Sequence, residues 1–108
     1  DRDLDKALDL SRKAVLAEPQ NSSFLDTIGW IYFKRKNFEN AQKYIEKSLE
    51  IDPNNPEVLD HLGDVYNEQG IKDKAIEYWQ KAIDIDTDAE RIVKIKNKIS
   101  KFNWYFES

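Results

Sequence analysis

Apolar side chains recur along this chain at spacings of three and four residues, the pattern of helices that bury one face. In the stretch 22–55, one apolar stripe ends at Tyr32 and a second begins at Phe38, with Asn37 at a turn between them. Pro53 then ends the second helix, because a proline ring cannot continue the backbone hydrogen-bond ladder. The pattern predicts two short helices joined by a turn.

This helix pair is repeated with a period of 34 residues. Gly29 falls on Gly63 after a forward shift, and Ala41 falls on Ala7 after a backward shift. A fixed period in this range is typical of a solenoid, in which stacked repeats bury a continuous core. We therefore predict an all-α fold of antiparallel helix pairs, with the two glycines where adjacent helices approach most closely.

The period divides the chain, one domain by its size, into five segments. Residues 1–21 match the second helix of a repeat whose first helix is missing, 22–55 and 56–89 are full repeats, 90–102 form a capping helix, and 103–108 are an aromatic tail. The chain opens in the middle of a repeat and contains no methionine. We expect it to be the C-terminal piece of a longer protein, with its N-terminal helix partly uncovered.

Residues that favour helix starts precede the predicted helices. Asn21 and Asn55 stand at N-cap positions, and Pro56 stands at a first helical position, where proline is well tolerated. Thr87 and Glu90 have the spacing of a capping box, in which the two side chains satisfy opposite backbone donors.

The final helix, predicted over roughly 88 to 102, has one apolar and one basic face. Its apolar residues are Ile92, Ile95, Ile99 and Phe102, and the lysines between them are Lys94, Lys96, Lys98 and Lys101. The phase of the apolar positions differs from that of a further repeat, so we expect a cap that closes the stack. A solvated cap is the favoured interpretation of the basic face; a membrane surface or an acidic partner is the alternative.

Three consecutive aromatic residues, Trp104, Tyr105 and Phe106, follow the capping helix. They fold back on that helix or fill a groove of this molecule or of a neighbour. A disordered tail would instead leave three rings exposed.

The repeat resembles the tetratricopeptide repeat (TPR), a helix–turn–helix unit with leucine-glycine, tyrosine, small residues and a closing proline at set positions. In the central unit these positions are held by Leu25, Ile28, Gly29, Tyr32, Ala41, Ile45, Ser48 and Pro53. In the next unit they are held by Leu59, Leu62, Gly63, Tyr66, Ala75, Trp79, Ala82 and Thr87. Ser11, Ser48 and Thr87 depart from the family pattern, without disabling it.

The resemblance covers residues 1–89 and implies a right-handed α-solenoid, the TPR superhelix, closed here by the capping helix. Several short segments of the sequence also look like the C-terminal repeats of long bacterial TPR proteins, some of which are cell-envelope lipoproteins. The compartment stays open between the cytoplasm and the periplasm or cell envelope, because the absence of cysteine does not report it.

In this family the first helix of each unit lines a concave groove, so the resemblance implies a set of partner-binding positions. They are Asp26, Thr27, Trp30, Phe33, Lys34, Asp60, His61, Asp64, Asn67 and Glu68. Family members that bind chaperone tails use lysine, asparagine and arginine at such positions to hold a terminal carboxylate. That clamp is absent here, so we expect no binding of acidic chaperone C-termini.

Two features of this set are specific to the chain. Trp30 and Phe33 are large rings that the repeat signature does not require, and they serve either as partner anchors or as packing against the neighbouring unit. An acidic row, namely Asp26, Asp60, Asp64 and Glu68, either selects positive charge or is a solvated face. His61 is expected to be a groove wall or hydrogen-bond partner rather than a switch, and Trp79 is expected in the core.

The inventory of reactive groups is short. One histidine, three glycines explained by the repeat and no cysteine leave no basis for a catalytic constellation, a cofactor or a histidine metal site. A net charge of −4 argues against nucleic acid, and the lack of a long apolar run argues against membrane insertion. We predict that the chain is not an enzyme.

The sequence therefore predicts a protein-interaction scaffold that binds a basic or amphipathic peptide, or a partner protein, in the concave groove. The alternative is a structural segment that caps a longer solenoid and self-associates through its N-terminal helix or aromatic tail. A third interpretation is the accessory domain of an enzyme whose catalytic part lies elsewhere.

Overall fold

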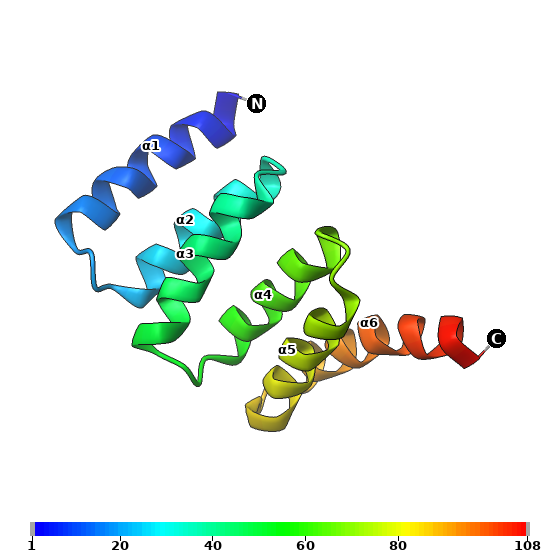
Figure 1. Ribbon diagram of the computed structural model, residues 1–108. Helices are drawn as coiled ribbons and strands as arrows, with labels where there is room; N and C mark the ends of the chain where they lie inside the picture. The colour runs from blue at the N-terminus through cyan, green and yellow to red at the C-terminus, as the bar shows by residue number, and fades with distance from the viewer. Residues whose placement is uncertain (1, 108) are drawn as a thin grey trace.

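The computed structural model describes residues 2–107, with side chains through residue 102. The described part contains six helices and no strands. They are α1 (Arg2–Ala17), α2 (Ser22–Lys34), α3 (Phe38–Ile51), α4 (Pro56–Glu68), α5 (Lys72–Ile85) and α6 (Ala89–Glu107). Helices α2 and α3 form one pair, α4 and α5 form the next, and α1 and α6 stand at the two ends of the stack (Figure 1). The predicted all-α solenoid is confirmed.

The helix starts follow local polar residues. Asn21 and Asn55 are N-caps, as predicted: the Asn21 side-chain oxygen accepts from the Phe24 N–H at 3.1 Å, and that of Asn55 accepts from the N–H groups of the second and third residues of α4. Asn37, expected at a turn, caps α3 through the Asn40 N–H. Each cap satisfies donors that the first turn of a helix leaves unpaired.

The two turns inside the helix pairs share one backbone conformation. Gly70 has a φ of 81°, and Lys36, 34 residues earlier, has a φ of 63°. Both lie in the left-handed region, which glycine adopts without strain and other residues rarely adopt. The chain therefore repeats its turn geometry even where the sequence does not repeat the glycine.

Close helix approach explains the glycines of the repeat. A Cβ on Gly29 would lie 2.6 Å from Cγ1 of Ile45, and a Cβ on Gly63 would overlap the indole of Trp79. Trp79 is 1% exposed, which confirms its predicted place in the core. The prediction for both glycines is likewise confirmed.

Helix α6 differs from the prediction at both ends. Its first turn is capped by Asp88, whose carboxylate accepts from the Arg91 N–H at 3.2 Å, so the predicted cap by Thr87 is wrong. Asp86 fixes this start, because it accepts from the Asp88 N–H and from the Arg91 guanidinium. The helix also continues to Glu107, since neither proline nor glycine interrupts it. The side chains of the predicted aromatic tail lie outside the described residues.

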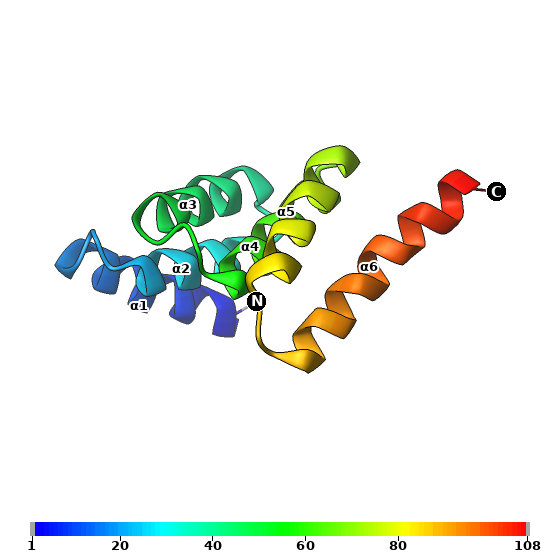
Figure 2. The same cartoon turned by 90° about the horizontal axis from the view of Figure 1, so that it is seen from below.

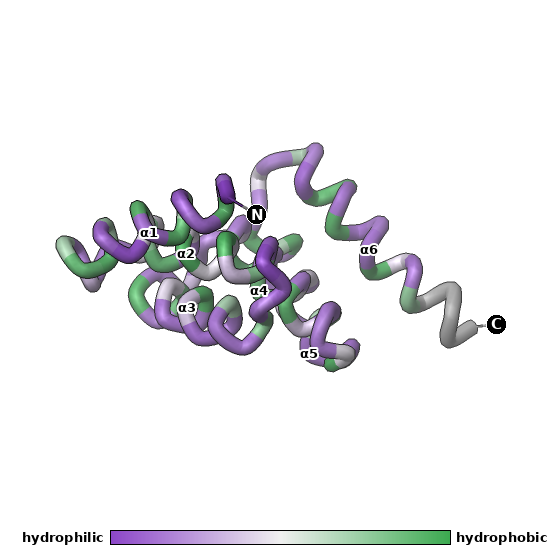
Figure 3. The backbone as a smooth tube through the Cα atoms, turned by 90° about the horizontal axis from the view of Figure 1, so that it is seen from above, coloured by the Kyte–Doolittle hydropathy of each residue, from purple (hydrophilic) through white to green (hydrophobic). Residues whose placement is uncertain are grey.

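Helix α6 packs on α5 through its apolar face and then leaves the stack (Figure 2). Ile95 is fully buried, and the Phe102 ring lies 5.8 Å from the Trp79 ring. Figure 3 shows polar and apolar residues alternating along every helix, as expected for helices that bury one side. The stretch of α6 from Ile95 to Phe102 thus covers the last repeat.

Candidate functional site

Four rings form a continuous row that runs from the start of α3 along α2 and onto α4. The Trp30 ring lies 4.4 Å from that of Phe33, at an interplanar angle of 7°, and 4.0 Å from that of His61. The ring of Phe38 extends the row as a tilted neighbour, 5.6 Å from that of Phe33 at an interplanar angle of 59°. We call these residues, Phe38, Phe33, Trp30 and His61, the ring stack. Because His61 belongs to the next repeat, Trp30 does pack against the neighbouring unit, yet it remains only half-buried.

Asp26 holds the histidine end of the ring stack. One carboxylate oxygen lies 2.9 Å from Nδ1 of His61 and the other 3.2 Å from it. The two side chains are 15% and 14% exposed, so the contact is largely shielded from solvent. It fixes the imidazole plane against Trp30, which agrees with the expected role of His61 as a hydrogen-bond partner.

Two further carboxylates of the predicted acidic row, Asp60 and Asp64, contact a lysine of α6. The Lys98 ammonium lies 2.9 Å from an oxygen of Asp60 and 2.9 Å from an oxygen of Asp64. The Asp64 oxygen also accepts from the Trp79 indole N–H at 3.2 Å. Asp60 and Asp64 are therefore partly neutralised within the chain and are not an ordinary solvated face.

Burial sets the ionisation of this cluster. It raises the pKa of the Asp64 carboxyl, although the hydrogen bond and charge of Lys98 act in the opposite direction. Burial also acts to lower the pKa of Lys98, but the hydrogen bonds that its ammonium donates to Asp64 and Asp60 outweigh it, and the pKa is raised. The Lys98 ammonium is thus the group that opposes the effect of burial on the Asp64 carboxyl.

The remaining predicted residues lie beside this cluster without joining it. Thr27 is exposed, and its hydroxyl donates to the Ser23 carbonyl within α2 at 2.9 Å. Lys34 and Glu68 are exposed near the helix ends, and Asn67 is half-buried. We call the surface formed by the ring stack, Asp26, Asp60 and Asp64 the first-helix face.

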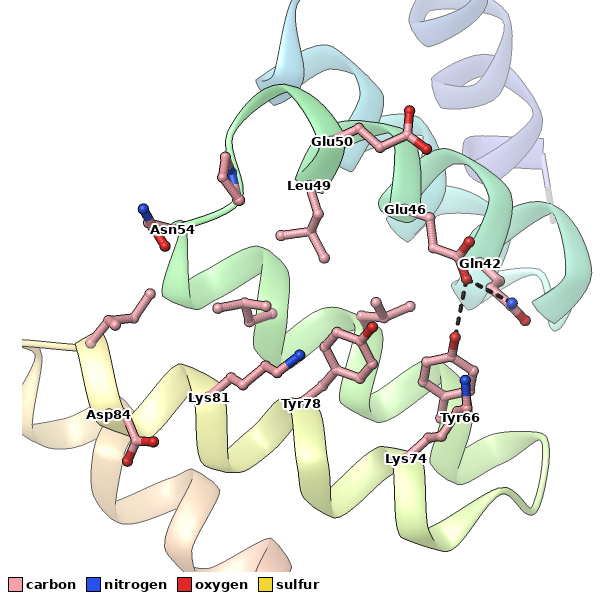
Figure 4. A pocket seen from close by; sticks show the side chains of 14 residues that line it. Gln42, Glu46, Leu49, Glu50, Asn54, Tyr66, Lys74, Tyr78, Lys81 and Asp84 are labelled. Carbon is pink, nitrogen blue, oxygen red and sulfur yellow. Dashed lines mark hydrogen bonds between the residues drawn. The ribbon is translucent and has the colours of Figure 1, made fainter.

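A hollow lies on the opposite side of α4, where the sequence indicated none. Leu59, Leu62 and Tyr66 of α4 line its floor, and its volume is about 760 Å³. Figure 4 shows α4 between α3 and α5, which form the walls. A helix turns 100° per residue, so these three side chains point away from Asp60 and Asp64. We call this hollow the second-helix pocket.

Tyr66 organises one end of the pocket. Its hydroxyl donates to Glu46 on α3 at 3.1 Å, and its ring stacks on that of Tyr78 on α5 at 5.6 Å. Burial, reinforced by the hydrogen bond to Glu46, raises the pKa of Tyr66 to about 12. Tyr32 and Tyr44 stack in the same way one repeat earlier, where Arg12 donates to the Tyr32 hydroxyl. The stacked tyrosines are thus a repeated feature that the sequence period itself signals.

Comparisons with known proteins agree with this architecture. Two tetratricopeptide-repeat family models match the chain, one at residues 27–55 and the other at residues 44–77. Residues 27–77 therefore carry tetratricopeptide repeats. No curated protein sequence matches it at a significant level.

Solved structures share the fold at low sequence identity. TTC0263, a thermophilic TPR protein from Thermus thermophilus, is similar at 21% identity and a TM-score of 0.81, over 89% of this chain and 50% of that one. A MamA protein is similar at 22% identity and a TM-score of 0.69, over 75% and 44%. The N-terminal domain of stress-induced protein-1 from C. elegans is similar at 20% identity and a TM-score of 0.67, over 81% and 74%. The chain spans about half the length of the MamA and Thermus structures.

The family and the fold define the general class of function. The chain is a helical-repeat scaffold for protein interactions, a class that is typically non-enzymatic. Among the described residues, no helix is long and apolar enough to cross a membrane, and no group of acidic or histidine side chains could hold a metal ion.

Proposed function

We propose that the chain binds a peptide or partner-protein segment on the first-helix face. The ring stack is the observation that carries this proposal. It joins two repeats in one rigid surface, and its central ring, Trp30, remains half-buried. Aromatic side chains held in place by their neighbours lose little entropy on binding, which is why they serve so often as anchors.

The charges beside the ring stack favour a basic or amphipathic segment. Lys98 supports this choice, because it is an ammonium that already bridges Asp60 and Asp64 at 2.9 Å each. Two carboxylates and one ammonium leave a net negative charge there, and exposed Glu68 adds negative charge at the end of α4, so a basic segment of a partner would be attracted to this face. The partner's apolar side chains would contact the edges of Trp30 and Phe33.

The test uses a labelled helical peptide of about 16 residues with leucine and lysine at helical spacing, and a second peptide with glutamate in place of lysine. We expect anisotropy titrations to show tighter binding of the lysine peptide. Trp30→Ala and Phe33→Ala should each weaken it about tenfold, as loss of an anchor does. Phe24→Ala is the matched control, a half-buried ring on the same helix outside the ring stack. Equal affinity in all three variants would refute the proposed face.

The second candidate is self-association through α1, which rests on two exposed leucines. Leu10 is 67% exposed and Leu16 is 82% exposed, and large apolar side chains on a surface favour association. Sedimentation of the chain, with and without a Leu10→Lys, Leu16→Lys double substitution, tests this candidate. A monomer in both cases would rule it out. Removal of residues 103–108 tests assembly through the predicted aromatic tail in the same experiment.

A further inference from the structure

The second-helix pocket has the composition of a helix-binding groove. Leu59, Leu62 and Tyr66 lie three and four residues apart on α4 and form an apolar floor. Half-buried Leu49 and 42%-exposed Ile85 extend it on either side. We propose that this pocket docks one amphipathic helix of a partner protein, independently of the first-helix face.

The two walls of the pocket carry opposite charges near its rim. Glu46 and Glu50 line the α3 wall, whereas Lys74 and Lys81 line the α5 wall (Figure 4). Asp84, the acidic residue of the α5 wall, accepts a hydrogen bond from Gln80 of its own helix. A docked helix would therefore place basic residues toward α3 and acidic residues toward α5.

Both lysines are held in position before any partner arrives. The Lys74 ammonium lies 5.5 Å from the centre of the Tyr66 ring, and the Lys81 ammonium lies 4.6 Å from that of Tyr78. The Lys81 ammonium also lies 3.8 Å from a carboxylate oxygen of Glu77, but both side chains are 55% exposed, so a partner carboxylate can still reach Lys81. An ammonium resting on a ring face has already lost part of its rotational freedom, which reduces the cost of pairing it.

The dimensions fit a short helix. Each wall is a helix of 14 residues, or about 21 Å at the usual rise of 1.5 Å per residue. A volume of about 760 Å³ accommodates a row of side chains from a helix laid between the walls. An amphipathic helix that docks into a groove presents its own apolar anchors three and four residues apart, in a row that can lie along the apolar floor.

The charged walls also fix the direction of the docked helix. A helix with a basic flank and an acidic flank pairs with both walls in one direction and with neither after reversal. A peptide with two basic flanks, or two acidic flanks, meets one favourable and one unfavourable wall in either direction. Mixed flanks are therefore the feature that distinguishes this site from a general apolar surface.

The probe is a labelled helical peptide of about 14 residues with a leucine stripe, lysines on one flank and glutamates on the other. Control peptides carry lysine on both flanks or glutamate on both. We expect the mixed peptide to bind best, and Lys81→Glu or Glu50→Lys to weaken it several-fold. Lys81→Glu should also strengthen binding of the double-lysine peptide, an effect that a merely unfolded variant would not show.

Ile85→Glu and Ile51→Glu form the matched pair for this test. The two isoleucines occupy the same repeat position and are 42% and 40% exposed, but only Ile85 lines the pocket. We expect Ile85→Glu to weaken the mixed peptide about tenfold and Ile51→Glu to leave it unchanged. Equal effects of the two substitutions would overturn the proposal.

Two further outcomes separate this site from others. Trp30→Ala should leave binding of the mixed peptide unchanged, and a loss in that variant would assign the peptide to the first-helix face instead. Sedimentation of the concentrated chain without peptide should show either a monomer or an association that Ile85→Glu does not change. A dimer that disappears in Ile85→Glu would identify a second copy as the occupant and overturn the proposal of a partner helix.

Discussion

The Lys98 ammonium on α6 lies 2.9 Å from a carboxylate oxygen of Asp64 on α4. The two residues are 34 positions apart, one full repeat, and the same ammonium also contacts Asp60. The capping helix therefore contributes more than apolar cover to the last repeat. It supplies the positive charge that neutralises two partly buried carboxylates of the first-helix face.

Lys98→Met should destabilise the chain, because it leaves Asp60 and Asp64 facing one another without a counter-ion. The Lys98 side chain is 33% exposed and the two aspartates are 14% and 20% exposed. The loss should thus lie between surface and buried ion pairs, about 2 kcal/mol in the free energy of unfolding from urea titration. Lys94 is exposed one turn earlier on α6, and Lys94→Met should change the free energy of unfolding by less than about 0.5 kcal/mol. Equal small effects would show that the ion pair contributes nothing.

The fold could be predicted because each repeat contains local sequence signals for its helices and for their packing. The period places Gly29 and Gly63 at close helix contacts, and local polar residues such as Asn21 and Asn55 cap the helices. These signals act over a few residues or over one period, so they can be recognised without a three-dimensional structure. The packing of Trp30 against the next repeat can be predicted from the sequence for the same reason.

The occupation of the acidic row is harder to predict, because it depends on how α6 is rotated about its axis. The sequence pattern places Lys98 on a solvated basic face, although its spacing of 34 residues from Asp64 is an available signal. The second-helix pocket leaves no signal, since a hollow is the space that remains between α3 and α5 once side-chain sizes are fixed. Asp88 caps α6 in place of Thr87 because Asp86 and Arg91 fix the chain before the helix begins.

Lys36→Gly should stabilise the chain, since Lys36 holds a φ of 63° that only glycine adopts readily. The left-handed conformation costs other residues roughly 1–2 kcal/mol, offset in part by the greater freedom of glycine in the unfolded chain. We expect a gain of about 0.5–1 kcal/mol in thermal or urea unfolding. Gly70→Ala is the reciprocal variant and should lower the free energy of unfolding by a similar amount. A Cβ at Gly70 would meet nothing within 4 Å, so the φ of 81° is the only source of strain. The prediction requires that the two substitutions change the free energy of unfolding in opposite directions.

Gly63→Ala should destabilise the chain through contact with Trp79. An added Cβ overlaps the indole, which is 1% exposed and donates to Asp64. Overpacking of this kind costs roughly 1–3 kcal/mol, which outweighs the gain of about 1 kcal/mol in helix propensity. Gly29→Ala should cost less, because aliphatic Ile45 adjusts more easily than a fixed ring. Urea unfolding followed by tryptophan fluorescence measures both effects, and wild-type stability of Gly63→Ala would contradict the close approach.

The start of α6 should respond to acid through Asp86. Hydrogen bonds from the Arg91 guanidinium, at 2.6 and 2.8 Å, hold the pKa of Asp86 below its ordinary value. A lowered pKa in the folded chain means stability that is present above about pH 4 and lost as the pH falls through the folded value. We expect Asp86→Asn to flatten part of the fall in melting temperature below about pH 4. Asp84→Asn, exposed on α5, is the control and should keep the wild-type profile.

Tyr66 should limit stability at high pH. Its pKa is raised to about 12, first by burial and then by the hydrogen bond to Glu46, against an ordinary value of 10.0. A raised pKa favours the neutral phenol in the folded chain, so this stability is fully present below about pH 10 and is lost as the pH rises toward about 12. Alkaline titration of phenolate absorbance should show a late ionisation that Tyr66→Phe removes. Glu46→Gln should move that ionisation to lower pH, because it removes the neighbouring negative charge while the ring stays buried. A single common ionisation near about pH 10 for all five tyrosines would contradict the burial of this hydroxyl.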